Sequence, residues 1–200
     1  MCALSIILSV IMSGVMLSRG DNLVTAPFSE IGEQNRALFV IWGATTAAAL
    51  FYNLRLLASR LSFHGRAFNV IAFVGCGMVI VTSSVVGLEP VRRIIHITSA
   101  ALFGGITALC ILFLLIVKFK LKKNRKRTAT YIFLLAIAAV IFIFATISAG
   151  WFTASTQMLI INVALVTMFF SNFVEKWTIA PHAESPEVEC PQAIDKTGDF

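Results

Sequence analysis

Acidic, basic and imidazole side chains lie close together in one short stretch of the chain, where their types suit acid–base chemistry or the binding of an anion. The segment Gly87-Leu-Glu-Pro-Val-Arg-Arg93 is followed by His96 and Ser99. On a helix, Arg92, His96 and Ser99 share one face because they are separated by four and three residues. A carboxylate such as Glu89 beside an imidazole favours the protonated ring, and a protonated ring beside arginines suits the binding of a phosphate or sugar group.

A second polar stretch, Thr25–Arg36, comes directly before a long apolar run. We expect the two stretches to form one surface that binds lipid headgroups or partner membrane proteins. The candidate binding residues are Ser29, Glu30, Gly32, Glu33, Glu89, Arg92, Arg93 and His96. A structural interpretation stays open, in which these side chains satisfy helix ends and reach water at a membrane interface.

Catalytic motifs are few. The histidines, His64, His96 and His182, are too far apart for a His-x-x-x-His or His/Cys metal set, and neither a G-x-S-x-G turn nor a phosphate-binding glycine loop occurs. A triad of Ser29 or Ser99 with His96 and a glutamate stays open, because closeness in sequence does not determine geometry. We therefore expect no catalytic residue, cofactor or metal. The alternative is a lipid-modifying hydrolase or acyl transferase that uses His96.

Six apolar runs must position these residues. The chain is 58% hydrophobic and 13% charged, whereas soluble domains are roughly 25% charged, and a membrane-crossing helix needs roughly 20 apolar residues. Unbroken apolar runs do not alternate as the strands of a membrane barrel must. The sequence predicts an all-α, polytopic membrane bundle over residues 1–177, followed by a polar, proline-bearing tail, 178–200, that we expect to be disordered. The expected spans are about residues 2–18, 37–58, 68–88, 94–117, 130–149 and 156–174.

Basic residues fall unevenly on the two sides of this bundle. One side carries the cluster Lys118, Lys120, Lys122, Lys123, Arg125, Lys126 and Arg127, together with Arg55, Arg60, Arg66, Lys176 and Lys196. The other side carries only Arg19, Arg36, Arg92 and Arg93. The positive-inside rule therefore predicts that the richer side and both termini face the cytosol. We expect the cluster to bind anionic membrane lipids and not nucleic acid, which would require a basic face on a folded domain.

Small residues at four-residue spacing predict how the helices pack. Gly43 and Ala47 form such a stripe in the second span, as do Ala100, Gly104 and Ala108 in the fourth. In lipid, small residues allow close backbone approach, so we expect the fourth helix to be central. The fifth span is almost entirely large and aliphatic, so we expect it to face lipid. A homodimer seam is the alternative use of these stripes.

The nature of the first span and a role in transport both stay open. The first span has the apolar stretch of a cleaved signal peptide but no basic segment before it. Asn162, Gln157 and several Ser and Thr side chains in the spans should hydrogen-bond across helices. A small-solute transporter stays an alternative function, although the prolines outside the spans predict unbroken helices and no carboxylate lies mid-span.

Three places resemble the FRAG/DRAM/SFK family of six-span eukaryotic membrane proteins. The first is Pro27-Phe28-Ser29-Glu30-Ile31-Gly32, before the second span. The second is His96 at the start of the fourth helix, followed by Ser99, Ala100, Ala101 and Phe103. The third is Glu175-Lys176-Trp177, which departs from the family pattern because Lys176 separates Glu from Trp. A bacterial six-helix family of unknown function is similar at the first two places and competes with this resemblance.

The eukaryotic resemblance implies cytosolic termini and residence in endomembranes (lysosome, Golgi or endoplasmic reticulum) or the plasma membrane. It implies a role in lipid-anchor remodelling, phosphoinositide regulation or autophagy, generally without an established catalytic chemistry. Membrane lipids, other membrane proteins or a second copy of the chain are the partners it suggests. Ser29, Glu30, Gly32 and His96 are the positions carried over.

Overall fold

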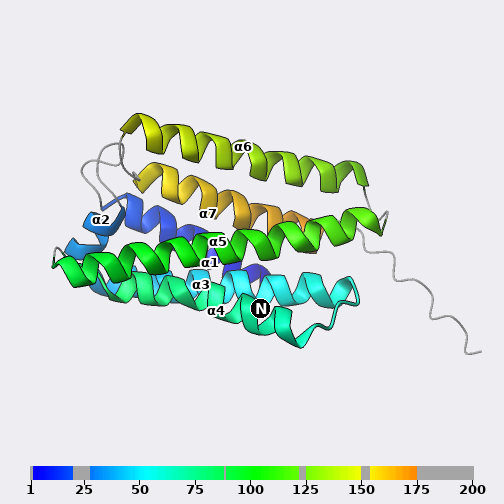
Figure 1. Ribbon diagram of the computed structural model, residues 1–200, viewed down its shortest axis with the longest axis horizontal. Helices are drawn as coiled ribbons and strands as arrows, with labels where there is room; N and C mark the ends of the chain where they lie inside the picture. The colour runs from blue at the N-terminus through cyan, green and yellow to red at the C-terminus, as the bar shows by residue number, and fades with distance from the viewer. Residues whose placement is uncertain (1, 20–27, 88, 122–124, 150–153, 175–200) are drawn as a thin grey trace, which may run out of the picture.

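The computed structural model describes residues 2–19, 28–87, 89–121, 125–149 and 154–174, and within these ranges every regular element is a helix (Figure 1). The all-α prediction is confirmed for these residues. The elements are α1 (Cys2–Leu17), α2 (Phe28–Gln34), α3 (Arg36–Arg60), α4 (Arg66–Ser84), α5 (Pro90–Lys120), α6 (Arg125–Ala149), α7 (Ala154–Phe169) and the π-helical turn η1 (Phe170–Val174).

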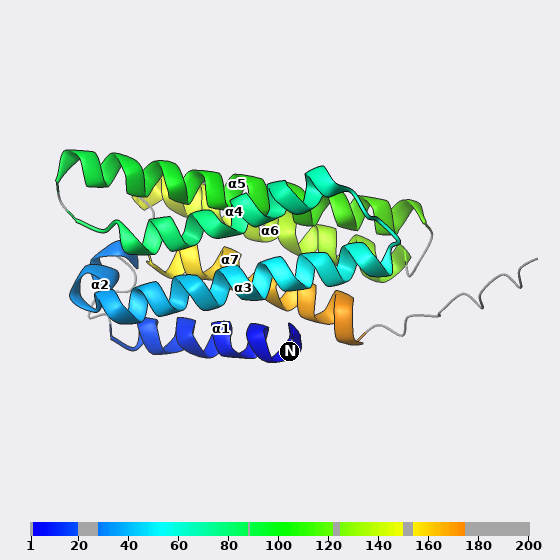
Figure 2. The same ribbon diagram turned by 90° about the horizontal axis from the view of Figure 1, so that it is seen from below.

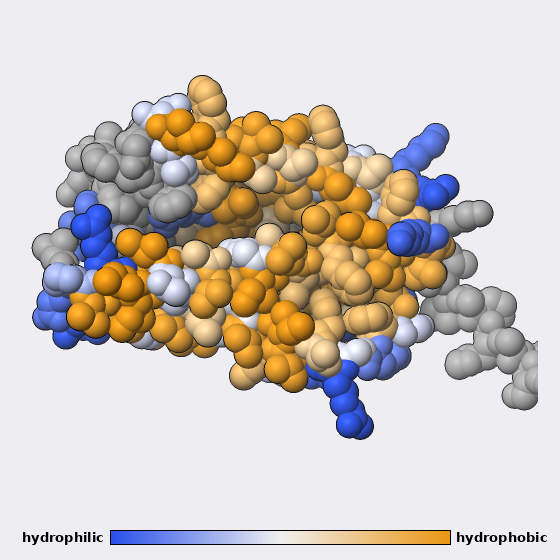
Figure 3. Space-filling model, viewed as in Figure 1, coloured by the Kyte–Doolittle hydropathy of each residue, from blue (hydrophilic) through white to orange (hydrophobic). Residues whose placement is uncertain are grey.

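Among the described residues, five helices are long and apolar enough to cross a membrane. They are Arg36–Arg60, Arg66–Ser84, Pro90–Lys120, Arg125–Ser148 and Ala154–Phe173. The first expected span corresponds to α1, which is apolar but has 16 residues. Large apolar side chains such as Ile147, which is 75% exposed, lie on the outside of the bundle, and apolar residues cover the middle of the face drawn in Figure 3. A surface of this kind is compatible with an integral membrane protein, because lipid tails can solvate it.

The long helices run side by side along the longest axis of the molecule (Figures 1 and 2). Helix α2 and the start of α5 lie at one end, which we call the mixed-charge end. The α3–α4 connection and the end of α5 lie at the other, which we call the basic end. The charged residues described at the mixed-charge end are Arg19, Glu30, Glu33, Arg36, Glu89, Arg92 and Arg93, and those at the basic end are Arg55, Arg60, Arg66, Lys118, Lys120, Arg125, Lys126 and Arg127.

Helix α3 is the central helix. In an 18-residue apolar stretch of each long helix, the share of residues that are buried is 50% for α3. The same share is 33% for α4, α5 and α7, and 6% for α6. The prediction that the fourth span is central was therefore wrong. The fifth span, α6, was predicted to face lipid and is largely exposed, as a lipid-facing helix requires. The buried residues of α3 include Trp42, Leu50, Leu54 and Leu57, which recur at helical spacing and join α1, α4 and α7 in one core.

Two glycines explain how closely α3, α4 and α5 pack. An added Cβ at Gly43 of α3 would overlap the Ser83 side chain of α4, and one at Gly75 of α4 would overlap the Ile106 side chain of α5. The stripe in α3 therefore packs inside the bundle as predicted. By contrast, a Cβ at Gly104 or Gly105 would meet nothing within 4 Å. The prediction that the α5 stripe packs inside was wrong, because α4 approaches α5 through its own glycine, Gly75.

Hydroxyl groups join neighbouring helices inside the bundle. Ser9 Oγ lies 2.8 Å from Thr46 Oγ1, which connects α1 to α3, and Trp42 Nε1 donates to Ser13 Oγ at 3.0 Å. The expectation that Ser and Thr side chains of the spans bond across helices is confirmed here for Thr46. Asn162 differs from the expectation, because its Oδ1 atom is buried without a hydrogen-bond partner.

Candidate functional site

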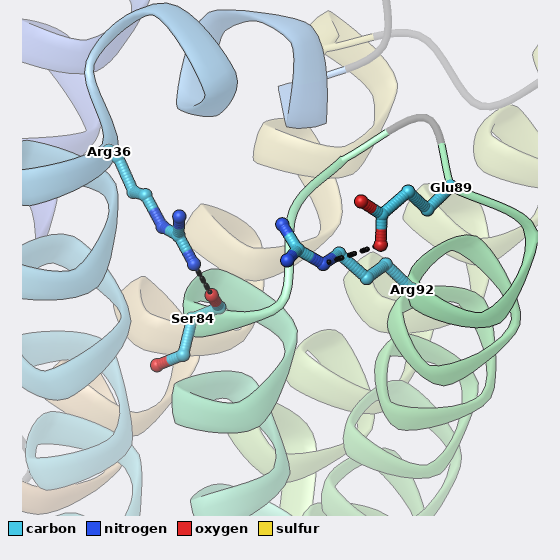
Figure 4. Close-up of polar contacts among 4 residues, drawn as sticks. All are labelled: Arg36, Ser84, Glu89 and Arg92. Atoms are coloured by element: carbon cyan, nitrogen blue, oxygen red, sulfur yellow. Dashed lines mark hydrogen bonds and ion pairs between the residues drawn. The ribbon is translucent and has the colours of Figure 1, made fainter.

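The ion pair at the mixed-charge end joins Glu89 to Arg92 at the start of α5 (Figure 4). Arg92 Nε lies 3.1 Å from Glu89 Oε2, and both side chains are largely exposed. Pro90 occupies the first turn of α5, where the absence of a backbone N–H costs no hydrogen bond. Glu89, the carboxylate expected beside the His96 imidazole, is therefore paired with Arg92 in the first turn of α5.

Arg36 has a structural contact at the same end. Its Nη2 atom donates to the carbonyl oxygen of Ser84 at 2.9 Å, as Figure 4 shows. Ser84 is the last residue of α4, where carbonyl groups lack partners within the helix. The guanidinium group thus links the first turn of α3 to the last turn of α4, and the positive charge is favourable at that helix terminus.

His96 faces α4. Its Nδ1 atom lies 2.9 Å from the carbonyl oxygen of Thr82, and because a carbonyl only accepts, Nδ1 is the donor of this bond. Thr82 Oγ1 lies 2.9 Å from Ser99 Oγ, and Ser99 donates to the carbonyl oxygen of His96. Within the described ranges, no serine hydroxyl or carboxylate bonds to the His96 ring. The arrangement fastens α5 to α4.

The candidate residues of α2 divide into two groups. Glu30 and Glu33 are exposed and Ser29 is half-buried. Gly32 lies against Phe39, so that an added Cβ would overlap the aromatic ring. Phe39 stacks on Trp42 with ring centroids 5.4 Å apart, and Gly32 therefore allows α2 to pack onto α3. No hydrogen bond or ion pair between described residues joins these α2 side chains to Glu89, Arg92 or His96.

The cationic cluster at the basic end contains both exposed and buried side chains. Lys120, Arg125, Lys126 and Arg127 are exposed, and the Arg125 guanidinium lies 4.8 Å from the centre of the Phe119 ring. Lys122 and Lys123 lie outside the described residues.

Lys118 differs from the exposed cations because its side chain is fully buried, although we expected it to contact lipid. Its Nζ atom donates to Ser171 Oγ at 2.8 Å and lies 5.5 Å from the centre of the Tyr131 ring.

A buried polar network at the basic end was not anticipated. Asn53 donates to the carbonyl oxygens of Ala49 and Cys2, and Asn172 donates to the Asn53 carbonyl oxygen at 3.1 Å. Arg60 donates to the carbonyl oxygen of Asn172. The network joins α1, α3 and η1, and the signal for it in the sequence was the pair of asparagines within apolar spans.

Two cations converge on η1. Arg60 bonds to Asn172, and Lys118 bonds to the adjacent Ser171. The carbonyl groups in the last turn of a helix lack intrahelical partners and carry partial negative charge. The positive charges of Arg60 and Lys118 therefore offset the partial negative charge at the end of α7. Single π-helical turns are frequent at functional sites.

Comparison of the chain with family models, with curated proteins and with solved structures finds no match. The described residues contain no group of three or more His, Cys, Asp or Glu side chains that could hold a metal ion. What the described residues offer is two charged ends of unlike composition on either side of an apolar band.

Proposed function

We propose that this chain is a six-span membrane factor without catalytic activity, that both of its termini face the cytosol, and that its basic end binds anionic lipid headgroups. The observation that carries the proposal is the distribution of charge. Every acidic residue described by the structure, namely Glu30, Glu33 and Glu89, lies at the mixed-charge end. Exposed cations from α3, α4, α5 and α6 surround the basic end, and such an excess marks the cytosolic side of membrane proteins.

The size of the lipid interaction follows from the exposed cations. Each Lys or Arg close to an anionic leaflet contributes about 1 kcal/mol. Arg125, Lys126 and Arg127 are consecutive, exposed and placed in the first turn of α6. Three such residues together correspond to about 3 kcal/mol, or about a hundredfold in affinity.

The test compares two triple variants of the full chain in nanodiscs. Arg125→Gln/Lys126→Gln/Arg127→Gln removes the charge, whereas Arg125→Lys/Lys126→Arg/Arg127→Lys keeps it. Enrichment of a spin-labelled anionic lipid over a zwitterionic one is measured around each protein. We expect the enrichment to fall strongly in the neutral variant and to persist in the charge-conserving one. Equal enrichment around both variants would contradict the proposal.

The absence of catalysis is supported by the position of His96, whose ring is engaged with the backbone of α4. Replacement of His96 by Ala should leave the cellular lipid composition unchanged, as should His64→Ala, which alters an exposed histidine. Loss of a lipid product in the His96 variant alone, with normal protein abundance, would favour the hydrolase or acyl transferase instead. The resemblance to the FRAG/DRAM/SFK family supports a role in lipid-anchor remodelling, phosphoinositide regulation or autophagy at an endomembrane or the plasma membrane.

A further inference from the structure

One face of α5 changes from buried to open along the length of the helix. Residues three or four apart place Arg93, Ile97, Ala100, Gly104, Ala108, Ile111 and Leu115 on this face. Ile111 and Leu115, toward the basic end, are 2% and 0% exposed. Ile97, Gly104 and Ala108, toward the mixed-charge end, are exposed, and a Cβ at Gly104 would meet nothing within 4 Å.

Helix α6 covers the buried part of this face and diverges from the open part. Near the basic end, Lys118 of α5 lies over the ring of Tyr131 of α6, and Tyr131 and Leu135 pack against the core. Figure 1 shows that α5 and α6 meet at this end and separate toward the other. Figure 3 shows a hollow in the same region, with apolar residues over most of its walls. The hollow is a cleft that tapers toward the basic end.

The shape and the lining of the cleft favour a hydrocarbon chain as its occupant. A helix with its side chains is about 10 Å across and of constant width, so a hollow that becomes narrower along its length matches a helix less well than it matches a flexible chain. A flexible acyl chain can fill a taper and restore the dispersion contacts that an open apolar wall lacks.

Arg93 supplies a charge at the wide end of the cleft. It lies eleven residues before Gly104, about 17 Å along the helix, which is close to half of the roughly 30 Å hydrocarbon core. Arg92 is paired with Glu89, whereas the exposed Arg93 side chain has no ion pair among the described residues. Arg93 also lies in the first turn of α5, where the helix dipole favours an anion.

We propose that the cleft holds one phospholipid from the leaflet at the mixed-charge end, with an acyl chain along Ala100, Gly104 and Ala108 and its phosphate at Arg93. This site lies at the opposite end of the molecule from the basic end. An experiment can therefore contradict the bound phospholipid without contradicting anionic lipid binding at the basic end, and the reverse also holds.

The test uses adjacent glycines of α5 as a matched pair. Gly104→Trp fills the cleft, whereas Gly105→Trp adds the same side chain about 100° further around the helix, also into open space. The full-length protein is purified in a mild detergent, and the phospholipid that it retains is measured by native mass spectrometry. We expect Gly104→Trp to abolish retention and Gly105→Trp to leave it unchanged. Equal retention by the two variants would overturn the proposal, as would conversion of a dimer to a monomer by Gly104→Trp without loss of lipid.

A second pair tests the headgroup without altering the packing. Arg93→Gln should lower phospholipid affinity about fivefold, which corresponds to about 1 kcal/mol. Arg19→Gln removes another exposed cation at the same end and should have no effect. An equal loss in both variants would show general charge attraction and would contradict a specific phosphate position. Enrichment of anionic lipid at the basic end should stay unchanged in all four variants.

Discussion

The two ends of the bundle use their charged residues differently. At the basic end, Lys118 and Arg60 turn inward and bond to η1, so that cations hold three segments of the chain together. At the mixed-charge end, Glu89 and Arg92 pair with each other in the open. Charges desolvated within a network affect stability strongly, whereas exposed pairs contribute little. The comparison indicates that cations hold separate segments together at the basic end, whereas the Glu89–Arg92 pair at the mixed-charge end joins neighbouring residues of one helix start.

The side of the membrane that each end faces should give the largest expected effect, because an inserted acceptor sequence is either glycosylated or not. A glycosylation acceptor sequence inserted between Phe63 and Gly65 should stay unmodified, since we place this connection in the cytosol. The same sequence inserted after Gly87 should be glycosylated. Gel mobility before and after glycosidase treatment measures both. Modification of the first insertion alone would reverse the orientation and would remove the basis for anionic lipid binding at the basic end.

Removal of a buried amide should cost the most stability. Asn53→Ala deletes the donor to Ala49 and Cys2 and leaves the Asn172 amide without one of its acceptors, at an expected cost of about 2 kcal/mol. Unfolding in detergent, followed by circular dichroism, measures the loss. Asn69→Ala, which changes a half-buried asparagine on α4, should alter stability by less than about 0.5 kcal/mol. Equal effects would contradict a stabilising role of the network.

A cross-helix bond toward the mixed-charge end should have an intermediate effect. Trp42→Phe keeps an aromatic ring beside Phe39 but removes the Nε1 donor to Ser13. The loss of one hydrogen bond predicts a destabilisation of about 1 kcal/mol. The double variant Trp42→Phe/Ser13→Ala should be no less stable than Trp42→Phe alone, and a thermodynamic cycle in detergent tests this. Additive losses would argue that the two groups do not interact.

The exposed ion pair should have the smallest effect. Glu89→Gln removes the partner of Arg92, and because both side chains are largely exposed we expect a change of less than about 0.5 kcal/mol. Thermal unfolding at low and high salt measures the difference, which should vanish at high salt. A loss as large as that of Asn53→Ala would remove the contrast between the two ends.

Much of the helical architecture followed from the sequence, because apolar runs about 20 residues long have few alternatives. The exposure of α6 was also predictable, since its residues are mostly apolar and it carries few polar side chains that need burial. The position of α5 was not. Small residues permit a close approach but do not specify which helix approaches, and Gly75 of α4 meets α5 at Ile106 instead.

The candidate site was only partly predictable. His96 and Ser99 were correctly placed on one face, because helical spacing determines it, and both contact Thr82. The backbone partner of His96 could not be foreseen, since it depends on how α4 and α5 align. The π-helical turn at η1 depends on a shift of one residue in hydrogen-bond register, and composition does not reveal such a shift.

The packing of α6 has a mechanical consequence. Helix α6 packs chiefly on α7, and its contact with α5 includes that of Tyr131 with Lys118. Helix α7 is packed against α1, α2 and α3, and close glycine contacts join α3 to α4 and α4 to α5. Because α6 is mostly exposed and packs chiefly on α7, lipid against its outer face would supply much of the contact that holds α6 in place.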